Sequence, residues 1–189
     1  MNKLVLAYSG GLDTSYCAKY LSAEKEYEVH AVSINTGGFT QEEIDGIKEK
    51  AFVLGAKTYK NINAITTFYN KVVKYLIFGN VLKNNTYPLS VSSERIIQAI
   101  EIVTYAKQIG AKYIAHGSTG AGNDQIRFDM IFQILAPEIE IITPIRDMKL
   151  SRQAEIEFLK GHGVELPWEK AQYSINKGLW GTSVGGKET

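Results

Sequence analysis

The residues with the clearest chemical potential follow the first apolar segment of the chain. Residues 3–6 predict a short strand, and the nine residues from Ala7 to Ser15 read Ala-Tyr-Ser-Gly-Gly-Leu-Asp-Thr-Ser. Glycines permit a tight turn whose N–H groups point at one guest, and a helix start adds unpaired N–H donors and a positive dipole end. Ser9, Thr14 and Ser15 add hydroxyl donors. This stretch predicts a cradle for a phosphate or pyrophosphate.

The loop differs from the common phosphate-binding loops. The segment contains neither G-x-x-x-x-G-K-[ST] nor G-x-G-x-x-G, and Asp13 stands in the region where a Walker loop has its lysine. An acidic side chain beside phosphates needs a cation between them, most simply Mg²⁺, so Asp13 is the candidate metal ligand. The simpler alternative is a Gly-Gly turn before a helix, with Asp13 and Ser15 acting only as capping residues.

Strand and helix patterns alternate along the chain. Residues 28–34, 56–62, 112–116 and 138–143 read as further strands, and helical patterns lie between them. Alternating strands and helices predict an α/β fold, a three-layer, doubly wound, mainly parallel sheet of the Rossmann-like type with helices on both faces. Glycine-rich or polar loops follow residues 7, 34 and 116, so all three are expected at one edge of the sheet, where ligands bind.

Several helix boundaries can be predicted from capping residues. Thr40 to Glu43 forms a capping box, and Ser151 is placed to cap a last helix that runs to Lys160. Apolar spacing predicts a long helix over residues 64–83, and Ser92 or Ser93 is expected to cap the next one. From His162 onward the pattern shows neither a helix nor a strand period.

Composition excludes several classes of function. The chain has 189 residues, 44% of them hydrophobic and 22% charged, with a net charge of +1, which suits one globular domain and calls for neither nucleic acid nor membrane as a partner. Its one cysteine, Cys17, excludes an internal disulfide and is expected to pack as a small apolar residue. With no signal peptide pattern and no long apolar run, we expect a cytoplasmic location.

Four segments together resemble the argininosuccinate synthase family, a member of the N-type ATP pyrophosphatases. The first is the loop of residues 7–15, and the second is residues 116–129, which match H-G-x-T-G-x-G-N-D-Q-x-R-F. The third is Tyr87-Pro88-Leu89 with Ser92, and the fourth is Tyr173 to Ile175 with Leu179 to Ser183. The match covers essentially the whole chain.

The resemblance implies a reaction and a set of binding residues. It implies ATP-dependent ligation of citrulline and aspartate through a citrullyl-adenylate, with AMP and pyrophosphate released, Mg²⁺ accompanying ATP, and a homotetramer. The implied ATP-binding residues are Ala7, Tyr8, Ser9, Gly10, Gly11, Leu12, Asp13, Thr14, Ser15, Thr36 and Gly117. Those implied for aspartate are Thr119, Asn123 and Asp124, and those for citrulline are Tyr87, Ser92, Asn123, Arg127, Ser174 and Ser183. Asp13 and Asp124 are the implied catalytic residues.

Three positions depart from the pattern of many relatives. Thr36 and Glu94 stand where alanine is frequent, and Asn176 stands where an aspartate is frequent. Family members also continue into a synthetase and oligomerisation domain. We therefore expect residues 1–165 to form the ATP-binding domain and residues 166–189 to begin the connection to that further domain. A chain without it is expected to bind ATP and to turn over poorly.

Other readings stay open at this point. The chain could be another N-type ATP pyrophosphatase, such as a tRNA-thiolating or amide-forming enzyme, although thiolation commonly uses paired cysteines. It could be a non-catalytic nucleotide-binding module, or a universal-stress-type or flavoprotein-like domain, which the second signature disfavours. Arg127 could simply pair with Asp124 or Asp129, and His116 fits a structural role better than an acid–base role.

Overall fold

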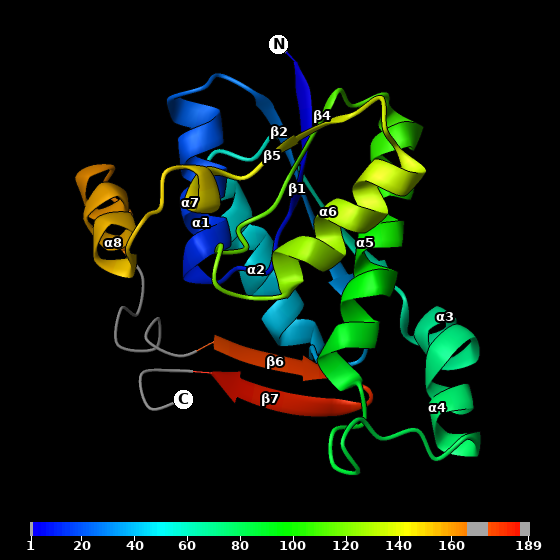
Figure 1. Ribbon diagram of the computed structural model, residues 1–189. Coiled ribbons are helices and arrows are strands. Elements are labelled where there is room, and N and C mark those ends of the chain that lie inside the picture. Colours follow the sequence, from blue (N-terminus) through cyan, green and yellow to red (C-terminus); the bar gives the residue numbers. More distant parts are fainter. Residues whose placement is uncertain (1, 166–173, 186–189) are drawn as a thin grey trace.

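The protein is built around one parallel sheet. The computed structural model describes residues 2–165 and 174–185. Five strands pair in parallel in the order β3-β2-β1-β4-β5 (Figure 1). Their bounds are β1 Lys3–Ala7, β2 Glu28–Asn35, β3 Thr58–Asn63, β4 Tyr113–Ala115 and β5 Glu140–Ile142. The predicted three-layer, doubly wound fold is confirmed.

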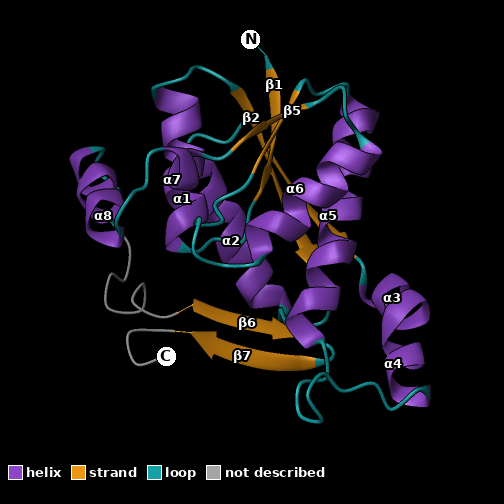
Figure 2. Cartoon of the chain, viewed as in Figure 1, coloured by secondary structure: helices purple, strands orange, loops and turns teal. Residues whose placement is uncertain are grey.

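Alternating residues of each strand supply the two halves of the core. In β1, Leu4 and Leu6 face one layer of helices and Val5 faces the other, and all three are fully buried. The first layer consists of α1 Leu12–Ala23, α2 Gln41–Val53, α7 Pro144–Asp147 and α8 Arg152–Gly161. The second consists of α3 Ile65–Phe68, the π-helical turn η1 Tyr69–Val73, α5 Ser90–Ile109 and α6 Asp124–Leu135 (Figure 2). The short helix α4 Lys74–Phe78 continues η1 and has no buried residue. Cys17 is fully buried in the first layer, as expected.

The strand order reverses direction between β1 and β4. The chain moves outward from β1 through β2 to β3, and then crosses back to place β4 on the other side of β1. In such sheets the loops on either side of the reversal diverge and leave a crevice for a ligand. The two loops with the most specific sequence patterns, residues 8–11 and 116–123, follow β1 and β4 and therefore flank this crevice.

The predicted helix boundaries are partly correct. Thr40 forms a complete capping box with Glu43, and the Ser151 hydroxyl caps α8 through Ala154 N–H, as predicted. The helix expected from Ser92 or Ser93 starts earlier, at Ser90, after Leu89 in the left-handed region. The stretch predicted over residues 64–83 ends at residue 78 and contains the π-helical turn. Apolar spacing does not reveal such a local change of helical period.

A hairpin that the sequence pattern does not predict crosses the carboxyl edge of the sheet. Strands β6 Ser174–Gly178 and β7 Gly181–Gly185 pair antiparallel and lie below the ends of the parallel strands in Figure 1. Trp168 and Tyr173, which the sequence places in the same terminal segment, lie outside the described residues. Within residues 2–165 and 174–185, no helix is long and apolar enough to cross a membrane.

Candidate active site

A cavity of about 810 Å³ opens at the carboxyl edge of the sheet. Its lining comes from the loops after β1 and β4, the ends of β2 and α5, and strand β6 of the hairpin. Of the residues expected to bind substrates, the cavity is lined by Ala7, Tyr8, Ser9, Gly10, Gly11, Leu12, Asp13, Thr14, Gly117, Thr119, Asn123, Asp124 and Arg127. The fold therefore gathers the two sequence signatures around one space.

The hydroxyl groups of the loop after β1 make weak hydrogen bonds within the loop. Gly10 has a φ of 75°, which favours glycine. The Ser9 N–H donates to Thr14 Oγ1 at 3.4 Å, and the two hydroxyl oxygens lie 3.2 Å apart. The Gly11 N–H contacts Ser9 Oγ at 3.4 Å. These long, weak contacts leave the donors easily transferred to an incoming phosphate oxygen.

A lysine from another element compensates for the one that this loop lacks. Lys50 on α2 donates from Nζ to the Gly10 carbonyl at 2.8 Å and lines the cavity. Burial lowers the pKa of Lys50. No local pattern indicates this role, because Lys50 lies 40 residues from Gly10 among several lysines of a mostly exposed helix.

The loops after β1 and β4 touch each other at Gly117. A Cβ at this position would lie 3.1 Å from the Asp13 carbonyl carbon and 3.2 Å from the Thr14 nitrogen. These separations are tighter than most side-chain contacts in proteins, so glycine is needed for the two loops to approach. Gly117, expected to bind ATP, therefore lies against the start of α1 and lines the cavity.

His116 supports the second loop from beneath. Its side chain is 1% exposed; Nδ1 accepts from the Ser118 N–H at 3.2 Å, and Nε2 lies 2.9 Å from Asp129 Oδ1. Since Nδ1 is an acceptor, Nε2 carries the proton and donates to the carboxylate. Arg146 contacts the other oxygen of Asp129. Burial raises the pKa of Asp129, but His116 and Arg146 outweigh it and lower the pKa.

Asp124 and Arg127, expected to bind different substrates, bind each other. Asp124 Oδ1 accepts from Arg127 at 2.6 Å, and Oδ2 accepts from Arg95 Nε at 2.9 Å. The i,i+3 pair that the sequence left open as an alternative is therefore present. Both partners still line the cavity, so the pair is accessible to a ligand carrying an amine or a carboxylate.

Tyr87 and Ser92 also lie together. The Ser92 N–H donates to the Tyr87 hydroxyl at 3.1 Å. Burial raises the pKa of Tyr87, yet the hydrogen bonds from Ser92 and the charge of Arg127 outweigh it and lower the pKa. Ser183 lies on β7, the strand whose first residue, Gly181, faces Ser90 at the start of α5. Ser174 begins β6, and the placement of its side chain lies outside the described part of the structure.

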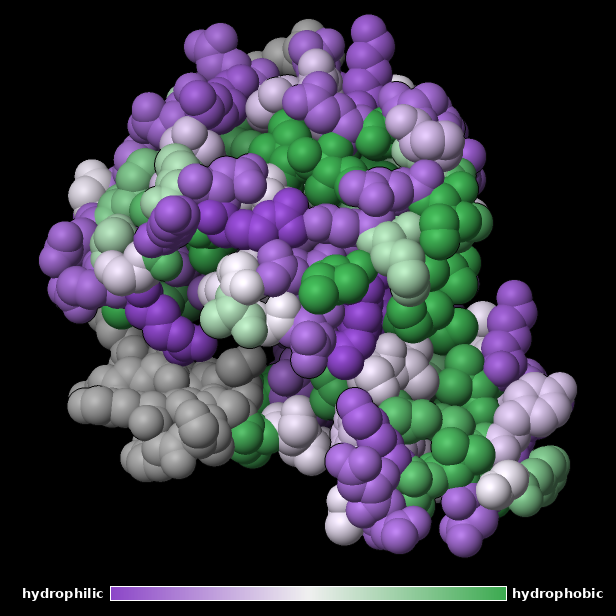
Figure 3. All heavy atoms as spheres, viewed as in Figure 1, coloured by the Kyte–Doolittle hydropathy of each residue, from purple (hydrophilic) through white to green (hydrophobic). Residues whose placement is uncertain are grey.

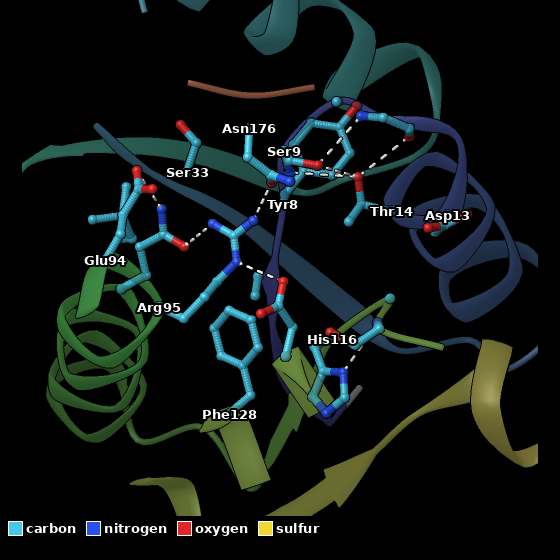
Figure 4. A pocket seen from close by; sticks show the side chains of 18 of the residues that line it. Tyr8, Ser9, Asp13, Thr14, Ser33, Glu94, Arg95, His116, Phe128 and Asn176 are labelled. Carbon is cyan, nitrogen blue, oxygen red and sulfur yellow. Dashed lines mark hydrogen bonds and ion pairs between the residues drawn. The ribbon is translucent and has the colours of Figure 1, made fainter. Parts of the chain in front are cut away.

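Two of the expected ATP ligands are enclosed. Ser15 is fully buried, and neither its Oγ nor the Tyr8 hydroxyl has a hydrogen-bond partner among the described residues. Thr36 is 1% exposed and donates its hydroxyl to Glu94. In Figure 4, Arg95 lies between Glu94 and Asn176 within the cavity wall. Thr36, Glu94 and Asn176, which depart from the pattern of many relatives, thus belong to one cluster.

Asp13 is held by a second carboxyl group from α8. Burial raises the pKa of Glu155 to about 8, and the charge of Asp13 adds to the shift. Burial also raises the pKa of Asp13, opposed by Glu155 and by the charge of Arg152. Among the described residues, no three His, Cys, Asp or Glu side chains gather as a metal site. The described residues therefore offer Asp13 and the neighbouring Glu155 at this position and no ready-made metal site.

The chain matches one protein family over most of its length. The family model described as "Arginosuccinate synthase N-terminal HUP domain" matches residues 3–165. The argininosuccinate synthases of Methanocaldococcus jannaschii and Sulfurisphaera tokodaii are 43% and 39% identical to this chain, over 97% and 98% of it. The enzyme of Oceanobacillus iheyensis is 40% identical over 96% of it. The chain spans about half the length of these relatives, covering 46%, 47% and 43% of them respectively.

A solved structure shows the same fold at low sequence identity. It is titled as a predicted subunit of tRNA methyltransferase from Methanocaldococcus jannaschii. The TM-score is 0.56 at 15% identity, covering 85% of this chain and 75% of that one. At this identity the likeness concerns the fold alone.

Proposed function

Because the chain belongs to the argininosuccinate synthase family, we propose that it forms the nucleotide-binding half of an enzyme that joins citrulline to aspartate. The reaction uses ATP and releases AMP and pyrophosphate through a citrullyl-adenylate. The contact of Gly117 with the start of α1 is the observation that carries the proposal, because it joins both signature loops into one wall of a single cavity. Ligation of two amino acids needs such a shared space, where positioning and charge stabilisation do most of the work.

The loop after β1 is proposed to hold the departing pyrophosphate. Its N–H groups and the start of α1 supply donors and the positive end of a helix dipole. Lys50, which contacts Gly10, and Arg152, which also lines the cavity, add positive charge beside the loop. Thr36 is proposed to support the adenosine site without a hydrogen bond to the nucleotide, since its hydroxyl is bound to Glu94.

The start of α6 is proposed to hold the two amino acids. The amino group of aspartate would take one oxygen of Asp124 from Arg127, with Thr119 and Asn123 beside it. The released guanidinium can then donate two parallel N–H···O hydrogen bonds to the carboxylate of citrulline. Tyr87 and Ser92 are proposed to complete the citrulline site, together with Ser174 and Ser183 of the hairpin. One ion pair would thus be exchanged for two ligand contacts.

Magnesium is proposed to arrive on the phosphates of ATP, with Asp13 as its protein carboxylate. When bound, the ion would neutralise charge on the departing pyrophosphate. Glu155, whose carboxyl group interacts with Asp13, would support it in this role.

The proposal is tested by measuring pyrophosphate release. The 189-residue chain is combined with the remaining half of the Methanocaldococcus enzyme, expressed as a separate polypeptide or fused to it. Release is expected to require citrulline, aspartate, ATP and Mg²⁺ together. Equal release with an unrelated acceptor while citrulline stays inert would refute the assignment.

A non-catalytic nucleotide-binding module is the second candidate. It is favoured by one observation, namely that Asp124 and Arg127, proposed to hold the amino acids, are bound to each other. Binding of ATP without any binding of aspartate or citrulline would support this candidate over the first.

A further inference from the structure

Glu94 is a buried carboxylate in the wall of the cavity. It lies on α5 and is 4% exposed. Its Oε1 atom accepts from the Thr36 hydroxyl and from Gln98 Nε2, the latter at 3.3 Å. A buried carboxylate requires donors of this kind, so these two side chains are bound to it rather than to solvent. Thr36 immediately follows β2 and is one of the residues expected to bind ATP, so Glu94 contacts the part of the site assigned to the nucleotide.

The contacts continue from Gln98 to the amino-acid side of the cavity. Gln98 Oε1 accepts from Arg95 Nη1 at 2.9 Å, and Arg95 Nε donates to Asp124 at 2.9 Å. Arg95 Nη2 donates to Asn176 of the hairpin. A continuous series of hydrogen bonds therefore leads from Thr36 to Asp124, and the dashed lines of Figure 4 trace its middle part through Glu94 and Arg95.

The hairpin covers the start of this series. A Cβ on Gly178 would lie 2.8 Å from Glu94 Oε1, and the Leu179 N–H donates to the Thr36 carbonyl at 2.9 Å. Gly178 of the hairpin and Thr36 after β2 therefore both lie against the Glu94 carboxylate. On the basis of the function proposed above, we propose that Glu94 is a positioning residue that couples nucleotide binding to amino-acid binding by holding Gln98 and, through it, Arg95.

The coupling has a direct electrostatic origin. Burial raises the pKa of Glu94, and this is opposed by the Thr36 hydrogen bond and the charge of Arg95. A nucleotide displaces water from the cavity that Glu94, Gln98 and Arg95 line, and their hydrogen bonds strengthen as the local dielectric falls. Gln98 is then held more firmly, and so is the Arg95 guanidinium that contacts Asp124. Without Glu94, the Gln98 amide loses its partner and Arg95 responds less to the nucleotide.

The test measures binding of two ligands to the 189-residue chain by calorimetry. The ligands are α,β-methylene ATP, which cannot be cleaved at the α–β bond, and L-aspartate. In the wild type, each ligand is expected to tighten the other about tenfold, by the same factor in both directions, since coupling of binding is reciprocal. Glu94→Ala is expected to bring this factor close to one. Glu94→Gln keeps an acceptor oxygen but loses the charge, and it is expected to give a factor between those of the wild type and Glu94→Ala.

A matched control lies on the same helix. Glu101 is half-buried on α5 and lines a different, shallow pocket, so Glu101→Ala is expected to keep the wild-type coupling factor. If Glu94→Ala does not fold, Thr36→Val removes the hydroxyl donor and is expected to weaken the coupling in the same way.

If the heat of aspartate binding is too small to measure, the NMR signal of Arg95 Nε–H is followed instead. The nucleotide is expected to move this signal in the wild type but not in Glu94→Ala.

The outcomes separate the two proposals. A wild-type chain that binds no nucleotide would refute the proposed function and this inference with it. Nucleotide binding that leaves both aspartate affinity and the Arg95 signal unchanged would refute the inference alone. The same holds for Glu94→Ala with the full wild-type coupling factor.

Discussion

At the scale of single residues, Gly117 is the position where added atoms have the clearest consequence. A Cβ there would press on the Asp13 carbonyl carbon at 3.1 Å and on the Thr14 nitrogen at 3.2 Å, which are backbone atoms and cannot rotate away. We expect Gly117→Ala to lower the free energy of unfolding by about 1–3 kcal/mol, the usual effect of overpacking. Urea unfolding followed by circular dichroism measures this change.

Gly122 provides the control in the same loop. A Cβ at Gly122 meets no heavy atom within 4 Å, so Gly122→Ala is expected to leave the free energy of unfolding within about 0.5 kcal/mol of the wild type. Equal losses in the two variants would show that loop flexibility, rather than contact with α1, explains the effect.

Glu155 makes the stability of the chain depend on pH. Burial and the charge of Asp13 raise its pKa to about 8 in the folded state, from 4.5 in the unfolded chain. The folded state therefore binds the proton more tightly, so stability is greatest below pH 4.5 as far as this group is concerned and is lost as the pH rises towards 8. We expect a loss of about 1–3 kcal/mol across this window, less than the full shift implies because the two carboxyls titrate together.

Glu155→Gln tests the origin of that dependence. The amide stays neutral and can still donate to Asp13, so the variant is expected to be more stable than the wild type at pH 8 and to lack the decline above pH 5. Thermal unfolding in the presence of EDTA, which removes adventitious metal, measures both proteins. Parallel pH profiles of the two would assign the decline to another group.

The sequence motifs identified the residues that line the cavity more successfully than those that support them. Patterns such as those of residues 9–15 and 116–129 stand out because glycines and hydroxyls are spaced along one stretch of chain. Lys50 and Glu155 act through contacts made across the fold, and no local spacing distinguishes them from other charged helix residues. Ser15 of the first signature and Thr36 after β2 were both expected to bind ATP. Both are buried, and neither lines the cavity.

At the scale of elements, the hairpin is held by contacts at its turn. Trp180 Nε1 donates to the Pro88 carbonyl at 2.7 Å, and the neighbouring Leu179 N–H donates to Thr36. Trp180→Phe keeps an aromatic ring and removes the donor, which we expect to weaken docking of β6 and β7 by about 1 kcal/mol. Amide hydrogen exchange is then expected to become several-fold faster in the hairpin, with β1 unchanged as an internal reference. Faster exchange in both would indicate global destabilisation instead.

Helices and strands whose ends are set by neighbouring residues could be predicted from the sequence, and those set by distant contacts could not. The capping box at Thr40 and the serine cap at Ser151 act within four residues, and both are present as predicted. The hairpin could not be predicted in this way, because Leu179 and Trp180 are bound by residues 92 or more positions away. The start of α5 was misplaced for a related reason, since the left-handed Leu89 is set by its loop rather than by a capping side chain.

At the scale of the whole molecule, the described chain offers a binding cavity but leaves apolar surface uncovered. Ile126, Met130 and Ile134 recur every four residues along α6 and are 61%, 44% and 66% exposed. Apolar side chains are visible along the flank formed by α5 and α6 in Figure 3. An exposed apolar stripe of this kind is typical of a surface that packs against another protein surface.

This arrangement predicts a separation of binding from catalysis. The 189-residue chain carries the pyrophosphate loop and is expected to bind α,β-methylene ATP, because the donors of that loop are all local. Ligation also requires both amino acids to be held in line and water to be kept out, and a small error in such positioning costs about 100-fold in rate. We therefore expect the chain alone to form argininosuccinate at least about 100-fold more slowly than the Methanocaldococcus enzyme, as measured by pyrophosphate release under identical conditions. A rate equal to that of the longer enzyme would show that one domain of this fold is sufficient for the complete reaction.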